Sequence, residues 1–136
     1  MSLKRPRTPR AGASAARPDG EAGFWLRPAN EADYGFTRAL YLEGAENHLS
    51  KIGRWDESRF VGLFDGGFKP DQMQIICADD RDIGFVQIVE FPDRLYLRQL
   101  HLIEGFRGRG IGSHLIEALF ERAAVAGKPV TLGPAR

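Results

Sequence analysis

The pattern of apolar and polar positions predicts a series of strands and helices between residues 24 and 132. Short apolar or alternating runs predict strands, whereas apolar residues spaced three and four apart predict helices. In chain order the predicted elements are strand 24–27, helix 31–43, helix 57–64, strand 73–78, strand 83–91, strand 95–103, helix 111–126 and strand 130–132. The expected order is therefore β-α-α-β-β-β-α-β.

Three residues mark the expected ends of the helices. Asn30, followed by the acids of the first turn, and Asp56 are typical N-terminal caps, and Gly127 is a typical C-terminal cap. The last helix should pack one apolar face on the rest of the domain. The residues predicted to be buried on that face are Ile111, Leu115, Ile116, Leu119, Phe120 and Ala123.

The connections between the strands predict their directions. Short polar turns at residues 79–82 and 92–94 join the three central strands into an antiparallel meander. The helix over 111–126 then carries the chain back, so the final strand should run parallel to strand 95–103. The expected fold is of the α/β class, α+β type, with a mixed, mostly antiparallel sheet flanked by helices.

The composition of the 136 residues is that of one domain with a polar extension. A hydrophobic content of 43% is sufficient for a core. Residues 1–22 contain Leu3 as their one large aliphatic residue and several cations, which are Lys4, Arg5, Arg7, Arg10 and Arg17. Such a segment cannot bury enough surface to offset the entropy of ordering. We therefore expect a disordered basic tail over 1–22 and a single domain over 23–136.

The charge and cysteine content exclude several classes of protein. A net charge of +1 argues against a general nucleic-acid binder. The single cysteine, Cys77, allows no disulfide within the chain and suits a reducing compartment. No apolar stretch approaches the length of a membrane span, and the N-terminus lacks the apolar core of a signal peptide. We expect a cytoplasmic protein with no nucleic-acid or membrane partner.

The glycine-rich stretch Glu104–Ser113 lies between a strand and a helix and is the main candidate for a functional site. The first amides of a helix lack partners within it, and the helix dipole makes that end positive. No Ser, Thr, Asp or Asn precedes Ile111 to cap these amides. The side chains of Arg107 and Arg109 add positive charge, and Gly108, Gly110 and Gly112 leave the backbone accessible. This combination predicts a loop that binds a di- or polyphosphate through its backbone.

Two other phosphate-binding motifs fit this stretch less well. In a dinucleotide-binding unit the third glycine would fall at Ser113, and an acid would follow about 20 residues on, whereas no acidic residue follows Glu121. The preceding strands are also expected to be antiparallel. A P-loop kinase needs Gly-Lys-Ser/Thr, which does not occur in the sequence.

The segment Arg107-Gly-Arg-Gly-Ile-Gly112 resembles the Gln/Arg-x-x-Gly-x-Gly/Ala signature of the GNAT N-acetyltransferase superfamily. The resemblance extends over residues 24–132, because the family has the same order of strands and helices. Shorter matches lie at Arg27-Pro28-Ala29-Asn30, Trp55-Asp56 and Leu95-Tyr96-Leu97. The resemblance implies the acyl-CoA N-acyltransferase fold and transfer of an acetyl group from acetyl-CoA to an amine, without a metal.

The resemblance also implies which residues bind the cofactor. The loop amides would hold the CoA diphosphate, and the strand backbone would pair with the pantetheine arm. A bulge would splay this strand from the final one, so that the cofactor enters the gap. The residues implied are Leu100, His101, Leu102, Arg107, Gly108, Arg109, Gly110, Ile111, Gly112 and Ser113.

The catalytic groups are less clearly indicated. The amine would attack the thioester directly, and the Leu102 amide is the candidate donor to the oxyanion. In some family members a base lies on this strand, on a face expected to hold Tyr96, Arg98, Leu100 and Leu102. Tyr96 and Glu90 are the catalytic candidates. Glu90 is open to a second interpretation as a solvated carboxylate at the end of its strand.

The family pattern normally continues after the last strand with a short helix, which carries a Tyr acting as the acid, and a β-hairpin. The sequence ends at Arg136, and no tyrosine follows Tyr96. We therefore expect a C-terminally truncated fold and a homodimer formed through the edge of strand 130–132. A truncated chain, a wall supplied by a partner and a vestigial fold remain open. The alternative function is a non-catalytic acyl-CoA-binding or dimerisation module, and the acceptor is an amine of a small molecule or a protein.

Overall fold

The computed structural model describes residues 23–132 of the chain. The predicted basic tail over 1–22, and residues 133–136, lie outside the described residues. The strands and helices are β1 Trp25–Pro28, α1 Tyr34–Leu49, α2 Glu57–Gly67, β2 Met73–Ala78, β3 Arg81–Phe91, β4 Arg94–Leu102, α3 Ile111–Ala126 and β5 Val130–Leu132, with short 3-10 turns between some of them. The predicted order of strands and helices is confirmed.

The helix ends follow the local signals in the sequence. The Asn30 side chain accepts from the Ala32 amide at 2.8 Å, while the Asp33 carboxylate accepts from the Asn30 amide at 2.9 Å. At α2 the Asp56 side chain accepts from the Arg59 amide at 3.2 Å. The sequence favoured an end of the first helix at about Glu43 and left open a broken continuation over 44–53, whereas α1 continues without a break through Gly44 to Leu49. One glycine does not end a helix that has favourable contacts on both sides of it.

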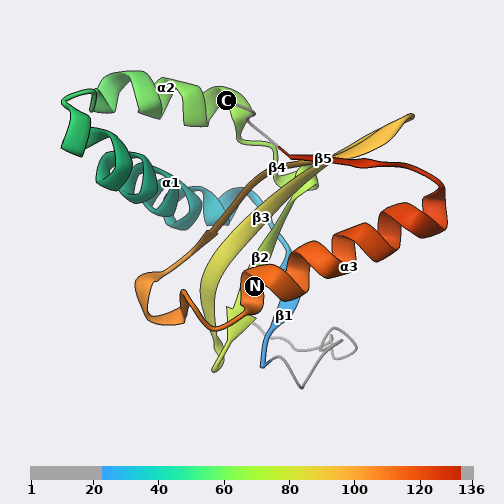
Figure 1. The fold of residues 1–136 in the computed structure, drawn as a ribbon. Helices are drawn as coiled ribbons and strands as arrows, with labels where there is room; N and C mark the ends of the chain where they lie inside the picture. Colours follow the sequence, from blue (N-terminus) through green and yellow to red (C-terminus); the bar gives the residue numbers. More distant parts are fainter. Residues whose placement is uncertain (1–22, 133–136) are drawn as a thin grey trace.

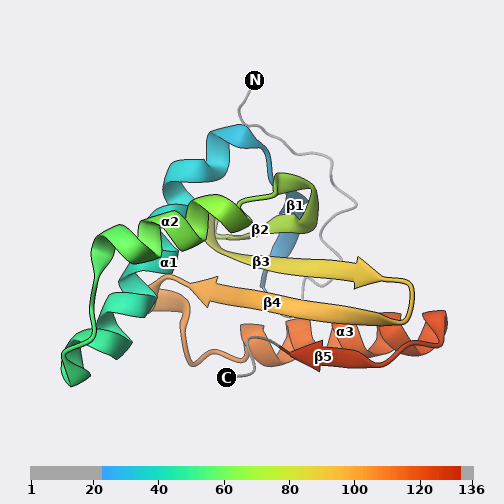
Figure 2. The same cartoon turned by 90° about the horizontal axis from the view of Figure 1, so that it is seen from above.

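The strands form one sheet in the order β1-β2-β3-β4-β5. Neighbouring strands are antiparallel except β4 and β5, which are parallel as predicted. Helices α1 and α2 lie on one side of the sheet and α3 lies on the other (Figures 1 and 2). Within the described sheet β5 is an edge strand, and the expected self-association through it stays a prediction.

Apolar side chains fill both sides of the sheet. The cluster between the sheet and helices α1 and α2 consists of Leu40, Phe64, Met73, Ile75, Cys77 and Phe85. The cluster between the sheet and α3 consists of Val86, Leu95, Leu97, Leu119 and Ala123. The prediction that Phe120 is buried is wrong, since 51% of it is exposed. It lies about 100° around the helix from Leu119, beyond the width of the face that contacts the sheet.

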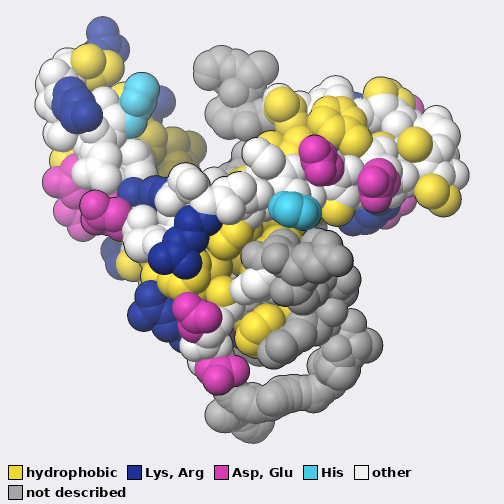
Figure 3. Space-filling view, turned by 60° about the horizontal axis from the view of Figure 1, so that its bottom comes forward, with side chains coloured by type: hydrophobic (Ala, Val, Ile, Leu, Met, Phe, Trp, Pro, Cys, Tyr) yellow, Lys and Arg dark blue, Asp and Glu magenta, His cyan; other side chains and the backbone are white. Residues whose placement is uncertain are grey.

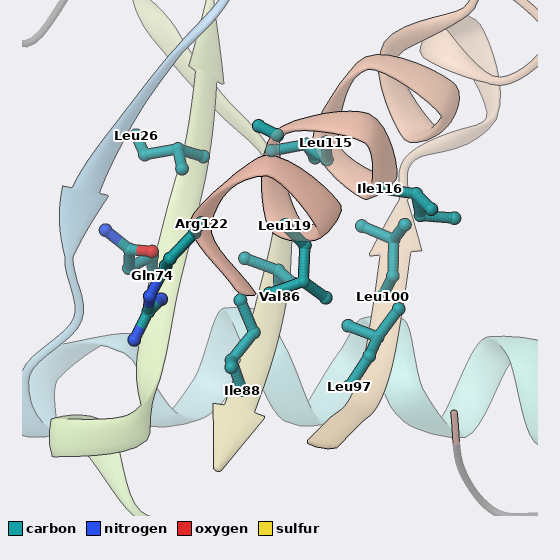
Figure 4. A pocket seen from close by; sticks show the side chains of 11 residues that line it. Leu26, Gln74, Val86, Ile88, Leu97, Leu100, Leu115, Ile116, Leu119 and Arg122 are labelled. Atoms are coloured by element: carbon teal, nitrogen blue, oxygen red, sulfur yellow. The ribbon is translucent and has the colours of Figure 1, made fainter. Parts of the chain in front are cut away.

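A bulge interrupts the pairing of β3 with β4. The register passes from Gln87↔Gln99 to Ile88↔Leu97, which leaves Arg98 without an opposite residue. The extra residue reverses the alternation of side chains, so Leu97 and Leu100 both point towards α3 (Figure 4). The expectation that Tyr96 and Leu100 share a face is therefore wrong. A regular strand would have placed them together, but the bulge lies between them.

Membrane-spanning length is not reached by any helix in the described part of the chain.

Candidate active-site cleft

A cleft of about 470 Å³ opens where β4 ends and α3 begins. It is lined by Gly44, Leu100, His101, Leu102, Arg107, Gly108, Gly110, Gly112 and Ser113. All the predicted cofactor-binding residues except Arg109 and Ile111 line this cleft. Ile111 is instead buried in the core, where it packs with Phe24 and Phe106.

The glycine-rich loop leaves the N-terminus of α3 open. Gly110 precedes the helix with a φ of 85°, Gly108 has a φ of 75°, and a Cβ at either position would meet nothing within 4 Å. No side chain caps the helix, and its first backbone hydrogen bond is from the His114 amide to the Gly110 carbonyl at 3.0 Å. The amides before His114 therefore lack partners within the helix and can bind an anion.

The two loop arginines have different environments. Arg107 Nε donates to the Leu102 carbonyl at 2.8 Å, and its Nη2 lies 3.5 Å from Glu43 Oε1. The Arg109 guanidinium instead lies 4.6 Å from the ring centre of Phe106, which the Arg81 guanidinium also contacts at 5.3 Å. Figure 3 shows basic side chains gathered between α3 and the part of the molecule formed by α1 and α2. Arg107 thus lies in the cleft, while Arg109 contributes to the positive potential beside it.

The end of β4 offers backbone groups to the cleft. The Ile103 amide donates to the Ile83 carbonyl at 2.8 Å. Because residues in an antiparallel pair alternately direct their backbone groups towards and away from the partner, Leu100 and Leu102 direct theirs away from β3. The contact of Arg107 with the Leu102 carbonyl is consistent with this direction. Among the described residues, no strand pairs with this side of β4 after Leu97.

The side chain of His101 also lines the cleft. Its ring stacks on Phe85, with the ring centres 5.0 Å apart, and its Nε2 lies 3.0 Å from Gln99 Oε1. Burial, and secondarily the charge of Arg107, lowers the pKa of His101 to about 4. The imidazole is therefore neutral at physiological pH.

The predicted catalytic residue Glu90 does not lie at the cleft. Its carboxylate binds Lys128 Nζ at 2.9 Å and Arg122 Nη2 at 3.2 Å. It lies six residues along β3 from Gly84, which pairs with Leu102, and this corresponds to about 20 Å. Lys128, and then Arg122, lowers the pKa of Glu90. The structure therefore shows an exposed, ion-paired carboxylate at the far end of the sheet.

Tyr96 also lies away from the cleft lining. It pairs with Val89 on one side and with Thr131 on the other, in the part of β4 that β5 covers. Its ring packs near that of Phe91, with 6.4 Å between the ring centres. The structure does not bring the two predicted catalytic residues to the end of β4, because both lie on the other side of the bulge from the cleft.

The sequence interpretation missed the side chain of His101, which was expected to contribute its backbone. A signal was present in the sequence, since Gln87, Gln99 and His101 are polar residues inside otherwise apolar strands. Buried polar side chains in such positions need hydrogen-bonding partners, and they often form a network. The spacing of Gln99 and His101 placed them on one face, but their partners on other elements were not readable.

Two further features do not form a reactive site. Burial, chiefly, raises the pKa of the Cys77 thiol to about 12, so it is not a ready nucleophile. A smaller cavity of about 140 Å³ lies under α3, and apart from Gln74 and Arg122 its lining is apolar (Figure 4). Residues 23–132 also hold no group of three or more His, Cys, Asp or Glu arranged to bind a metal ion.

Solved structures with a similar fold include acetyltransferases and a protein described as a possible acetyltransferase. A possible acetyltransferase from Clostridium difficile 630 has a TM-score of 0.63 and 11% identity, with 83% of this chain and 80% of that chain covered. The PaiA N-acetyltransferase from Thermoplasma acidophilum, in complex with coenzyme A, has a TM-score of 0.59 and 14% identity, with 76% and 74% covered. AAC(6')-Iy, in complex with the bisubstrate analogue CoA-S-monomethyl-acetylneamine, has a TM-score of 0.52 and 17% identity, with 82% and 80% covered.

These identities are low enough that the likeness shows the fold alone, and no curated protein matches the chain by sequence. A family model provides the stronger comparison. The model of the acetyltransferase (GNAT) family matches residues 36–132, which include α1 from its third residue on, α2, the whole meander, the glycine-rich loop and α3. The chain therefore belongs to the acetyltransferase (GNAT) family.

Proposed function

We propose that this chain is an acetyl-CoA-dependent N-acetyltransferase that moves an acetyl group directly to an amine. One observation carries the proposal: the open amides before α3 and the outward backbone of β4 line the same cleft. The first group suits a diphosphate and the second suits an extended chain containing amides. Coenzyme A contains both chemical groups in this order, joined as one molecule.

The proposed binding mode assigns a role to each part of the cleft. The amides over Gly108–Ser113 bind the diphosphate, and the backbone of Leu100 and Leu102 pairs with the pantetheine amides. Arg107 moves from the Leu102 carbonyl to a phosphate oxygen, since a phosphate is a stronger partner for a guanidinium than a carbonyl. The complexes of PaiA with coenzyme A and of AAC(6')-Iy with a bisubstrate analogue support this proposal by analogy of fold.

The proposed reaction has one tetrahedral intermediate. A neutral amine attacks the thioester carbonyl, and the Leu102 amide donates a hydrogen bond to the oxyanion that forms. The C–S bond then breaks, CoA leaves as the thiolate, and the amine nitrogen loses one proton. The acceptor is an amine of a small molecule or of a protein.

Titration calorimetry with acetyl-CoA tests the proposal. We expect one molecule to bind per chain, with a dissociation constant in the micromolar range, and binding that weakens as salt rises because the diphosphate is charged. Desulfo-CoA, which lacks the sulfur and so cannot carry an acetyl group, is the control ligand that measures binding of the coenzyme without the reaction. If millimolar acetyl-CoA produced no heat of binding, the proposal would be wrong.

A second candidate function is a non-catalytic acyl-CoA-binding module. It is favoured by the positions of Glu90 and Tyr96, neither of which lies at the cleft. Release of free thiol from acetyl-CoA, measured with a panel of small amines and lysine peptides, separates the two functions. Binding without amine-dependent thiol release would support the module.

A further inference from the structure

A chain of side-chain hydrogen bonds connects the end of α2 to the cleft. Gln87 is fully buried, and its Nε2 donates to the Gly67 carbonyl and to Gln72 Oε1, both at 3.0 Å. Gln99 Nε2 donates to Gln87 Oε1 at 2.7 Å. Gln99 Oε1 in turn lies 3.0 Å from His101 Nε2. This series of hydrogen bonds thus ends at the His101 imidazole, which lines the cleft.

This series of hydrogen bonds fixes the tautomer of His101. A backbone carbonyl only accepts hydrogen bonds, so the contact with Gly67 sets the orientation of the Gln87 amide. Its oxygen must then accept from Gln99, and this leaves the Gln99 oxygen facing the imidazole. Since an amide oxygen also only accepts, His101 must carry its proton on Nε2. Its Nδ1 therefore has a free lone pair.

The free Nδ1 faces α1 across the cleft. A Cβ added to Gly44 of α1 would lie 3.6 Å from Nδ1, and both residues line the cleft. The other neighbours of the ring are Phe85 of β3 and Tyr41 of α1, whose ring centre is 6.1 Å away. Arg107 is the nearby cation, and its own partner is Glu43 of α1. No carboxylate contacts the imidazole directly among the described residues.

We propose that His101 Nδ1 takes the proton from the attacking amine and transfers it to the sulfur of coenzyme A. The inference rests on the proposed acetyltransferase function and names the group that carries its proton. As the N–C bond forms, the amine proton passes to Nδ1 and gives an imidazolium. As the C–S bond breaks, the electron pair goes to sulfur, and the imidazolium returns the proton to the thiolate. One group serves as base and acid, and it ends in its original state.

The environment of His101 suits such a transfer. Burial and the charge of Arg107 destabilise the imidazolium, as the lowered pKa of about 4 shows. A destabilised imidazolium is a stronger acid than a thiol, whose usual pKa is about 8.5, so the final transfer to sulfur is downhill. The protonated amine of the tetrahedral intermediate is likewise a stronger acid than the free ammonium ion. A bound diphosphate that draws Arg107 towards itself would moderate the cost of the imidazolium.

The first test needs no activity. Long-range ¹H–¹⁵N spectra report the tautomer and the pKa of each of the three histidines, and His101→Gln assigns the signal. We expect Nε2–H with an unprotonated Nδ1 from pH 8 down to about pH 5. The Nδ1–H tautomer would overturn the proposal whether or not the protein is active.

The second test uses two matched variants. Gln at position 101 can still donate to Gln99, but its amide oxygen is too weakly basic to take a proton from the amine. We expect His101→Gln to lower kcat about 100-fold and to change the dissociation constant of acetyl-CoA less than threefold. Gln99→Glu places a carboxylate beside Nε2, which raises the pKa of His101. It should therefore move the acidic limb of the kcat/KM profile up by at least one pH unit.

The outcomes separate this inference from the proposed function. If the wild-type chain turns over but His101→Gln keeps more than a third of its kcat, the role of His101 is wrong and the acetyltransferase stands. The same conclusion follows if Gln99→Glu leaves the acidic limb in place. If the wild-type chain binds acetyl-CoA yet releases no thiol with any amine, the proposed function fails and the proton transfer with it.

Discussion

The backbone polar groups of β4 and α3 have protein partners at one end of this pair of elements and lack them at the other. At the far end, the Gly127 amide donates to the Ala123 and Ala124 carbonyls, Lys128 binds Glu90, and β5 pairs with β4. At the cleft end, α3 has no side-chain cap, and the backbone of Leu100 and Leu102 points away from β3. The same strand and helix are thus closed at one end and open at the other.

This difference shows which backbone groups can bind a ligand. Backbone amides and carbonyls without protein partners must bind water or a ligand, because an unpaired buried group is costly. Groups that are already paired have little to offer a ligand. The far end therefore contributes to stability, and the cleft end is prepared to bind an anionic, amide-containing molecule.

The largest expected effect comes from closing the open helix end. Gly110→Asp gives α3 the kind of cap that Asp56 gives α2, and it places a negative charge where the diphosphate would bind. We expect the affinity for acetyl-CoA to fall at least a thousandfold, which corresponds to about 4 kcal/mol. Titration calorimetry measures the loss.

Two variants serve as controls for this change. Gly110→Asn imposes the same positive φ on a side chain without the charge, and it should lose markedly less affinity. Asp56→Ala removes the cap of α2 and should cost about 1 kcal/mol of stability, with no change in acetyl-CoA binding. If Gly110→Asp bound acetyl-CoA as the wild type does, the open helix end would not be the diphosphate site.

The next effect concerns pH and the free energy of unfolding. His101 has a folded-state pKa of about 4 and an ordinary unfolded value of 6.5. Between these values the unfolded chain binds more protons, so stability is complete above pH 6.5 and decreases as the pH falls towards 4. The total loss by pH 4 is about 3 kcal/mol.

Urea unfolding at a series of pH values measures this dependence, and His101→Gln provides the comparison. The difference in slope between the two proteins should be confined to the window from pH 6.5 to pH 4. Equal slopes throughout that window would show that His101 is not held neutral in the fold, which contradicts the environment described for the cleft.

A smaller effect follows from the close approach of β3 and β4 beside the cleft. An added Cβ on Gly84 would overlap the His101 carbonyl oxygen and would lie 2.8 Å from Leu102 Cδ2. We expect Gly84→Ala to destabilise the fold by about 2 kcal/mol, because the backbone of β4 must move, and to weaken acetyl-CoA binding. Gly62→Ala, at an exposed position of α2 with open space, should instead stabilise it slightly.

The smallest effect is expected at the closed end. Glu90→Gln removes the ion pairs that its exposed carboxylate makes with Arg122 and Lys128. Because Lys128, and then Arg122, lowers the pKa of Glu90, the contribution of this carboxylate is present above its unfolded pKa and disappears as the pH falls. We expect kcat/KM to stay within twofold of the wild-type value. A hundredfold loss of kcat in a thiol-release assay would restore Glu90 as the base.

Local patterns predicted most of the fold. The spacing of apolar residues in α3, the polar turns of the meander and the caps at Asn30 and Asp56 act over a few residues, so the sequence reports them directly. The parallel direction of β5 followed from the helix that precedes it. The glycine-rich loop was readable for the same reason, because an uncapped helix start is a local feature.

The sequence by itself thus determined the elements, their order and the loop that opens α3. Tertiary structure alone decided the arrangement of side chains around His101 in the cleft. The bulge at Arg98 arises from the register between two strands, and it determines which side chains of β4 face α3. The tautomer of His101 depends on partners from α2, β3 and β4, and the distance of Glu90 from the cleft depends on strand pairing. The bulge, the tautomer and the position of Glu90 all depend on contacts between residues far apart in the chain. The spacing of neighbouring residues in the sequence does not indicate such contacts.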